Sequence, residues 1–316
     1  MRERLLENTP ESTPVSPSVT LIYEPTRLPD IKHTLFSMVA YLLLYRLAAL
    51  MPSTNEAVAV TTLTALFLIL LFTVSLARIV RTAREWLILV LGCAVLLIIT
   101  RTPGMRGVIR QLPGFDGLLM VGLAVSAGTL ISHLMKEMKI LLPAAVMLAM
   151  VDLYVVFGGG LVTQATSGNS PQAAKMMKAL TVNLPTTQAK VGAEPLQLAV
   201  GFADFLFIAL FFACFRRFGI PSRKTFKALT GVLMLYMLVV YFTGIPLPAL
   251  VPIAVVVISL NFRHFKYDRS ELFALLYAGL IVLALFGYLL HVSHKTQAKG
   301  AEIPAAGTEK ALPQGG

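Results

Sequence analysis

The sequence predicts an all-α, polytopic membrane protein with about nine transmembrane helices. Of its 316 residues, 56% are hydrophobic and only 14% are charged, and the mean hydropathy is +0.76. One soluble core could not bury that much apolar surface. Apolar runs that are long enough, or nearly so, to cross a hydrocarbon layer of about 30 Å recur along almost the whole chain.

Nine apolar runs carry this prediction, and basic residues gather in the short loops between them. The runs span residues 34–51, 57–77, 86–100, 117–134, 140–158, 196–215, 228–243, 247–262 and 271–291. The third, seventh and eighth runs are short, so the number of spans depends most on them. The net charge of +11 is then a topology signal of a membrane protein, and we expect no nucleic-acid partner.

Composition divides the chain into five segments. Residues 1–33 form a Pro/Ser/Glu-rich tail that we expect to be disordered, followed by an uncleaved first span, because no signal-peptide cleavage pattern precedes it. The further segments are the amino-terminal transmembrane helices at 34–139, a segment at 140–262 that contains two intramembrane acids, an additional transmembrane helix at 263–292 and a second disordered tail at 293–316.

Loop charge predicts the orientation of the chain. The loops 216–227 and 263–269 are strongly basic, whereas 243–247 has no charge. Because basic loops stay in the cytoplasm, we expect 216–227 and the amino terminus to be cytoplasmic. The loop 159–195 is then expected on the opposite side of the membrane.

Two acids lie deep in the predicted spans: Asp152 in "LAMVDLYVVF" and Asp204 in "VGFADFLF". A carboxylate in hydrocarbon costs at least about 2.5–3.5 kcal/mol on insertion scales. In continuous helices, Asp152 would lie roughly 9 Å and Asp204 roughly 13 Å from the same membrane face. Two such acids can share one proton, so that one activates water and the other protonates a carbonyl or a leaving amine. The plainer alternative is that each acid is hydrogen-bonded to a neighbouring helix.

A glycine and a group of prolines accompany the acids. Gly201 removes a side chain where a substrate backbone or a partner helix must come close, although ordinary helix packing explains it equally well. "GIPLPALVP" contains Pro246, Pro248 and Pro252, which withhold backbone donors and predict a broken backbone bordering the site. The alternative is proline in the first turn of a helix.

These segments resemble the GxGD-type intramembrane aspartyl proteases, the presenilin and signal peptide peptidase group. Asp152 in "VDLYVVF", "GFAD" at 201–204 and "PAL" at 248–250 have the order and spacing of that family over roughly residues 140–262. "GFADFLFIALFF" is especially similar to presenilin-like proteins from prokaryotes. The resemblance implies a presenilin-like fold in a prokaryotic plasma membrane and an intramembrane aspartyl endopeptidase. Its expected substrates are transmembrane or signal-peptide segments, with no cofactor or metal, and the sequence identifies no obligate partner.

The resemblance also implies residue roles. Asp152 and Asp204 would form the catalytic pair, and Gly201 would be the first motif glycine. The PAL segment, which helps to shape the active site and the substrate cleft, would be Pro248, Ala249 and Leu250. The 140–262 segment is therefore the expected catalytic half.

The chain departs from the family pattern in several places. Ala203 stands where the family has its second glycine, and Val151 stands where a tyrosine usually precedes the first aspartate. The methyl group of Ala203 is expected to narrow the site or alter specificity. Four predicted spans precede the Asp152 helix where the family has five, and the run 271–291 is additional.

The loop 159–195 contains an alternating pattern. Leu180, Val182 and Leu184 alternate with Thr181 and Asn183, which predicts a short extended strand. As an edge strand, it could pair with an unwound substrate. A flexible connector is the alternative. In presenilin, the corresponding loop carries a self-processing site.

Two other function classes use the same features. A proton-coupled transporter or channel also pairs intramembrane acids with a proline-broken helix, and a membrane scaffold would keep the fold without chemistry. Zinc and serine intramembrane proteases are disfavoured, because the sequence has no "HExxH" and Ser126 in "AVSAG" lacks the first glycine of a GxSxG-like motif. His291 and His294 lack a third ligand nearby, so we expect no metal site.

Overall fold

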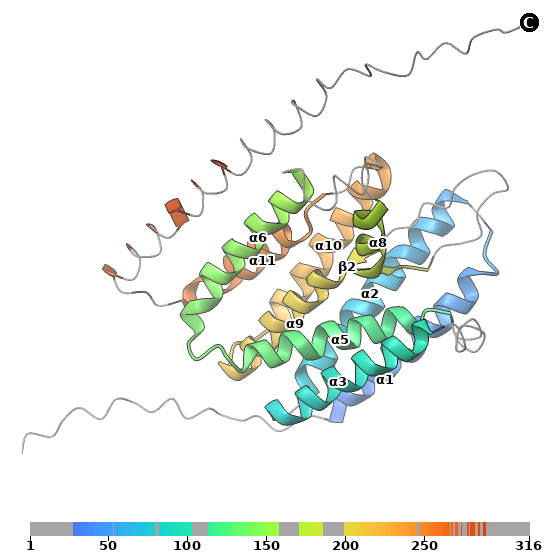
Figure 1. Cartoon of the computed structure of the whole chain (residues 1–316), viewed down its shortest axis with the longest axis horizontal. Helices are drawn as coiled ribbons and strands as arrows, with labels where there is room; N and C mark the ends of the chain where they lie inside the picture. The colour runs from blue at the N-terminus through green and yellow to red at the C-terminus, as the bar shows by residue number, and fades with distance from the viewer. Residues whose placement is uncertain are drawn as a thin grey trace, which may run out of the picture.

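The protein, seen here as a computed structural model, is predominantly helical (Figure 1). The structure describes residues 28–52, 54–79, 82–102, 113–157, 171–185, 199–244 and 247–265, and isolated residues between 267 and 288. In chain order the helices are α1 (Leu28–Ala48), α2 (Asn55–Ile79), α3 (Ala83–Arg101), α5 (Phe115–Ser132), α6 (Leu141–Phe157), α8 (Pro171–Ala179), α9 (Phe202–Arg217), α10 (Arg223–Thr243) and α11 (Leu250–Asn261), with 3-10 turns at Met138–Ile140 and Phe262–His264.

Among the described residues, five helices are long and apolar enough to cross a membrane. They are Asn55–Ile79, Ala83–Thr100, Phe115–Ser132, Met138–Val156 and Arg223–Thr243. This finding confirms the prediction of a helical membrane protein, whereas the count of nine spans stays a prediction. The run 271–291 lies largely outside the described residues, and residues 1–27 and 293–316 of the two predicted tails lie wholly outside them.

The first helix begins earlier than the sequence predicted. α1 starts at Leu28 rather than at the expected boundary of residue 34. Pro29 and Asp30 occupy its first turn, where a proline needs no backbone donor and an acid interacts favourably with the helix dipole. Asp30 also lies 3.8 Å from the guanidinium of Arg78 at the end of α2. A polar start of this kind is not visible in a search for apolar runs.

A small sheet interrupts the helical architecture. β1 (Thr181–Asn183) pairs antiparallel with β2 (Ala199–Gly201), with Val182 opposite Val200. The short strand predicted within residues 180–184 is therefore confirmed. The sequence interpretation missed α8, which directly precedes β1, and it also missed that β2 is the strand's partner.

The helix that contains Asp204 is shorter than predicted. The run 196–215 was expected to be a continuous helix, but Ala199–Gly201 is a strand and α9 begins only at Phe202. The expected depth of Asp204, counted along a helix from Pro195, is therefore wrong. The 16 residues of α9 rise about 24 Å, and the three residues of β2 add about 10 Å. Together they match a hydrocarbon thickness of about 30 Å.

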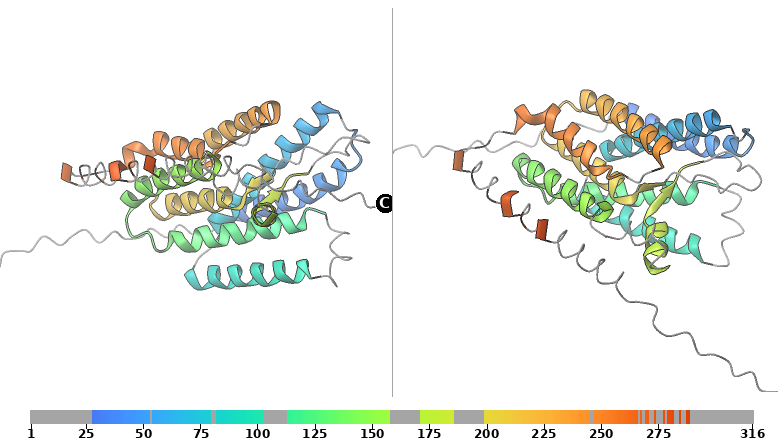
Figure 2. Two further views of the ribbon diagram at one scale, coloured as in Figure 1. Left: turned by 45° about the horizontal axis from the view of Figure 1, so that its top comes forward. Right: turned by 90° about the horizontal axis from the view of Figure 1, so that it is seen from above.

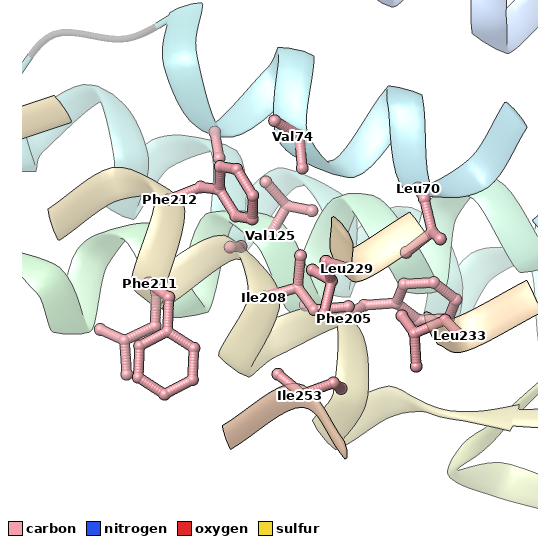
Figure 3. Close-up of a cluster of buried hydrophobic side chains, with 14 of the residues drawn as sticks. Leu70, Val74, Val125, Phe205, Ile208, Phe211, Phe212, Leu229, Leu233 and Ile253 are labelled. Carbon is pink, nitrogen blue, oxygen red and sulfur yellow. The ribbon is translucent and has the colours of Figure 1, made fainter. Parts of the chain in front are cut away.

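α9 lies at the centre of the bundle. It packs most extensively against α5 and also contacts α2 and α11, while α3 lies on the far side of α5 (Figure 2). Figure 3 shows the apolar core around α9, in which its own side chains meet those of four other helices. The labelled residues are Leu70 and Val74 from α2, Val125 from α5, Phe205, Ile208, Phe211 and Phe212 from α9, Leu229 and Leu233 from α10, and Ile253 from α11.

One glycine lets α5 and α9 approach this closely. A Cβ atom added to Gly128 would overlap the backbone carbonyl oxygen of Leu206 and would lie 3.1 Å from the amide nitrogen of Leu210. Backbone-to-backbone contact of this kind is possible only with a minimal side chain. Gly128 therefore fixes the position of α9 against α5, and with it the position of the first turn of α9.

Candidate active site

Asp204 lies in the first turn of α9, directly after the sheet. Gly201 is the residue that caps the helix, in extended conformation, and its backbone N–H donates a 3.1 Å hydrogen bond to Oδ2 of Asp204. This is the reciprocal half of a capping box, in which the third helical residue reaches back to the cap. A Cβ atom on Gly201 would lie 3.1 Å from the same oxygen. The glycine thus accommodates the carboxylate of the chain itself.

Asp152 reaches the PAL segment from α6. Oδ2 of Asp152 accepts a 2.8 Å hydrogen bond from the backbone N–H of Leu250. Leu250 is the first residue of α11, and the first N–H groups of a helix have no acceptor within the helix. The acid therefore satisfies an unpaired donor at the start of α11 and connects α6 to the segment before it.

The three PAL residues lie at this junction. Pro248 is buried just before the helix, Ala249 caps α11, and Leu250 is buried at 6% exposure. Pro252 falls in the first turn of α11, as the alternative interpretation of the prolines proposed, and Pro246 lies outside the described residues. The backbone at 247–249 is nevertheless not helical and borders the acids. The interpretation as a broken backbone therefore applies to Pro248, and the interpretation as a first-turn proline applies to Pro252.

The two acids and one tyrosine converge from different helices. The charges of Asp152 and Asp204 are close enough to interact, and both act on Tyr236 of α10. Each carboxylate has one oxygen bound by a backbone N–H. The second oxygen of each acid has no protein donor among the described residues, which leaves it available for water or a substrate.

A pocket opens beside Asp204. It contains about 530 Å³ of empty space, part of it open to the surroundings, and α2, α9, α10 and α11 supply its walls. Its lining is mostly apolar, with Leu66, Leu233 and Ile253 among its residues. The polar side chains are those of Asp204 and Tyr236. An apolar cavity with few polar groups is typical of a ligand site.

The departures from the family pattern lie outside this pocket. Ala203 is exposed and does not line the pocket, so its methyl group does not narrow the space beside Asp204. Val151 is also exposed, at 54%. Ser126 is buried and donates to the carbonyl of Gly122 within α5, as expected for a residue that packs between helices. Within the described part of the chain, no group of three or more His, Cys, Asp or Glu side chains could hold a metal ion.

The residues of the predicted substrate-pairing strand have different surroundings. Val182 and Leu184 are buried at 1% and 2% exposure, whereas Leu180 is 48% exposed. The N–H of Phe202 donates to the carbonyl of Leu180, so the alternation of an antiparallel ladder directs the carbonyl of Asn183 to the outer edge of β1.

That outer edge is partly occupied. The hydroxyl of Tyr45 from α1 donates a 3.1 Å hydrogen bond to the carbonyl oxygen of Asn183. The same alternation directs the N–H and C=O of Ala199 away from β1, on the opposite edge of the sheet. That edge leads directly into Gly201 and Asp204. The outer edge of β2 is therefore the sheet edge that leads into the acids, whereas substrate pairing by β1 stays a prediction.

Sequence reasoning missed Tyr236, Tyr45 and Gly128. Tyr236 lies in "LMLYMLVVY", where nothing distinguishes it from an aromatic residue that faces lipid. Gly128 was visible in "AVSAG", and its spacing of four residues from Ala124 signals small-residue helix packing, but not which helix packs there. Comparison of the chain with known protein families, with curated proteins and with solved structures finds no match.

Proposed function

We propose that this chain is an intramembrane aspartyl endopeptidase with Asp152 and Asp204 as its catalytic pair. The observation that carries the proposal is that both carboxylates, which come from separate helices, lie within electrostatic range of each other and are each held through one oxygen by a backbone N–H. Each acid keeps one oxygen that accepts from no protein donor among the described residues, and Asp204 also lines the pocket.

In the proposed reaction the pair shares one proton. The ionised acid takes a proton from water as the water oxygen bonds to the substrate carbonyl carbon, and the protonated acid donates its proton to the carbonyl oxygen. The tetrahedral intermediate then loses that proton to a carboxylate as its C=O bond reforms and the C–N bond breaks. The other acid protonates the leaving nitrogen. The products are one carboxyl and one amine terminus, and the pair again holds one proton.

The outer edge of β2 supports a mode of substrate binding. A transmembrane substrate must unwind before its peptide bond can be attacked, and an extended segment can then add to a sheet edge. The N–H and C=O of Ala199 point to that edge, five residues before Asp204. A strand that pairs there would bring its backbone beside the acids. Loop charge further supports a cytoplasmic amino terminus, which gives the active helices the direction found in signal peptide peptidases.

Cleavage of a membrane-embedded reporter peptide tests the proposal. Purified wild-type protein in detergent or liposomes should release products whose masses define one or a few cleavage positions. Asp152→Asn and Asp204→Asn should each abolish cleavage, because neither amide can carry the shared proton. Asp116→Asn is the matched control, since Asp116 is an exposed acid in the first turn of α5, and it should keep wild-type activity.

The same samples distinguish the alternatives. A scaffold would cleave nothing, and neither Asp→Asn substitution would change its binding of the reporter peptide. A transporter would cleave nothing but would move protons into liposomes in a manner that depends on both acids. Cleavage that survives both Asp→Asn substitutions would refute the proposed pair.

A further inference from the structure

The hydroxyl of Tyr236 is buried beside the acids and has no hydrogen-bond partner among the residues that the structure describes. Its oxygen is inaccessible to solvent and contacts no donor or acceptor within the described part of the chain. Tyr41, Thr62 and Thr230 also have buried hydroxyls without partners among the described residues. Of these four residues, Tyr236 is the one that lines the pocket with Asp204.

An unpaired buried hydroxyl is unfavourable and calls for an explanation. Leaving such a group unsatisfied weakens a fold, and most buried polar groups find a partner. The rest of the Tyr236 environment is ordinary: Leu233 and Val240, one turn away on α10, and the adjacent Met237 line the same pocket with apolar side chains. A phenylalanine would fill this space equally well without the unpaired group.

We infer that the Tyr236 hydroxyl is a hydrogen-bond donor for the substrate, directed at the carbonyl oxygen of the bond to be cleaved. This inference rests on the proposed proteolytic function. Tyr236 lines the same pocket as Asp204 and feels the charges of both acids, so a substrate carbonyl bound in that pocket beside Asp204 would also lie beside Tyr236. Negative charge develops on the carbonyl oxygen in the transition state, before the proton from the acid has fully arrived, and a phenol donor fixed in advance stabilises that state more than the ground state. No proton is transferred.

Tyr236→Phe tests this role, with Tyr241→Phe as the matched control. Both substitutions delete one hydroxyl from α10, but the hydroxyl of Tyr241 donates to the backbone carbonyl of Asn55. We expect Tyr236→Phe to lower kcat on the order of 100-fold with little change in KM. It should leave the melting temperature unchanged or slightly raised, because the deleted group has no partner in the described structure. Tyr241→Phe should keep wild-type kcat.

Inhibitor binding gives a second readout that does not depend on turnover. The probes are a peptide isostere with a tetrahedral, hydroxyl-bearing carbon at the cleavage position and a helical peptide without that group. Tyr236→Phe should bind the isostere about tenfold more weakly, the effect of one hydrogen bond, and the helical peptide as the wild type does. A residue that only packs in the pocket would change both affinities together or neither.

The outcomes separate the two proposals. If wild-type protein cleaves in an Asp-dependent way but Tyr236→Phe keeps full kcat and full isostere affinity, the donor role is overturned and the protease function stands. If wild-type protein neither cleaves the reporter nor binds the isostere, the protease function fails and the role of Tyr236 fails with it.

Discussion

The substitution Gly201→Ala would test whether the position of Asp204 controls activity. The alanine Cβ would lie 3.1 Å from Oδ2 of Asp204, whereas ordinary contact begins near 3.4 Å. The carboxylate must therefore move by about 0.3 Å (3.4 − 3.1) away from the same residue whose N–H it accepts at 3.1 Å. Since N–H···O bonds weaken beyond about 3.2 Å, the hydrogen bond is largely lost.

The expected size of the effect follows from that bond. A hydrogen bond to a charged group contributes about 1.5–3 kcal/mol, and each 1.36 kcal/mol of barrier is tenfold in rate. Gly201→Ala should thus lower kcat roughly 10- to 100-fold. Loss of the same bond should lower the free energy of unfolding by about 1.5–3 kcal/mol. The stiffer alanine backbone recovers about 0.4–1 kcal/mol of this, because Gly201 has φ −66° and ψ 143°, a conformation open to any residue.

The assay is cleavage of the membrane reporter with a melting curve on the same preparation. Gly231→Ala is the control: Gly231 lies in α10, and a Cβ atom there would meet nothing within 4 Å. That control should retain activity and gain up to about 1 kcal/mol of stability, the usual effect of replacing glycine within a helix. Wild-type kcat in Gly201→Ala would refute the argument that this glycine accommodates the carboxylate.

Three further predictions concern the framework around the site. Gly128→Val should force α5 away from the backbone of Leu206 and destabilise the protein by about 1–3 kcal/mol, seen as a lower melting temperature; a wild-type value would contradict the close crossing. Tyr45→Phe deletes the bond to the carbonyl of Asn183 and should reduce stability by about 0.5–1.5 kcal/mol without abolishing cleavage, whereas complete inactivation would place Tyr45 in the chemistry. A tag in the loop 159–195 should be accessible only from outside the cell, and labelling from the cytoplasm would reverse the predicted orientation.

The sequence predicted best where the physical cause is local. Hydrophobic runs identify helices because burial in lipid demands apolar side chains along the entire segment, and the alternation around Val182 identified β1 correctly. A carboxylate in such a run is conspicuous because of its desolvation cost. These properties led to Asp152 and Asp204, which the structure brings within electrostatic range of each other.

Features set by tertiary contacts were not predictable in this way. Residues 199–201 read as the start of an apolar helix, and only their pairing with β1 makes them a strand. The role of Gly201 depends on the carboxylate that folds back onto it, not on an approaching helix. The hydroxyl of Tyr236 is a candidate functional group only because the acids on α6 and α9 lie near it. No sequence pattern within α10 can reveal that proximity.

The extended conformation of β2 has a consequence for hydration. If α9 and β2 together complete one crossing, the N–H and C=O of Ala199 lie at membrane depth and point away from β1. Backbone groups there are tolerated only beside protein or a water-filled space, since each unsatisfied group costs several kcal/mol. If no protein covers that edge, water must occupy it, and in the proposed reaction a substrate strand would displace that water. The extended strand would then keep water, the second reactant of hydrolysis, beside the acids. Exchange of the backbone amide hydrogen with deuterium should accordingly be faster at Ala199 than along α9.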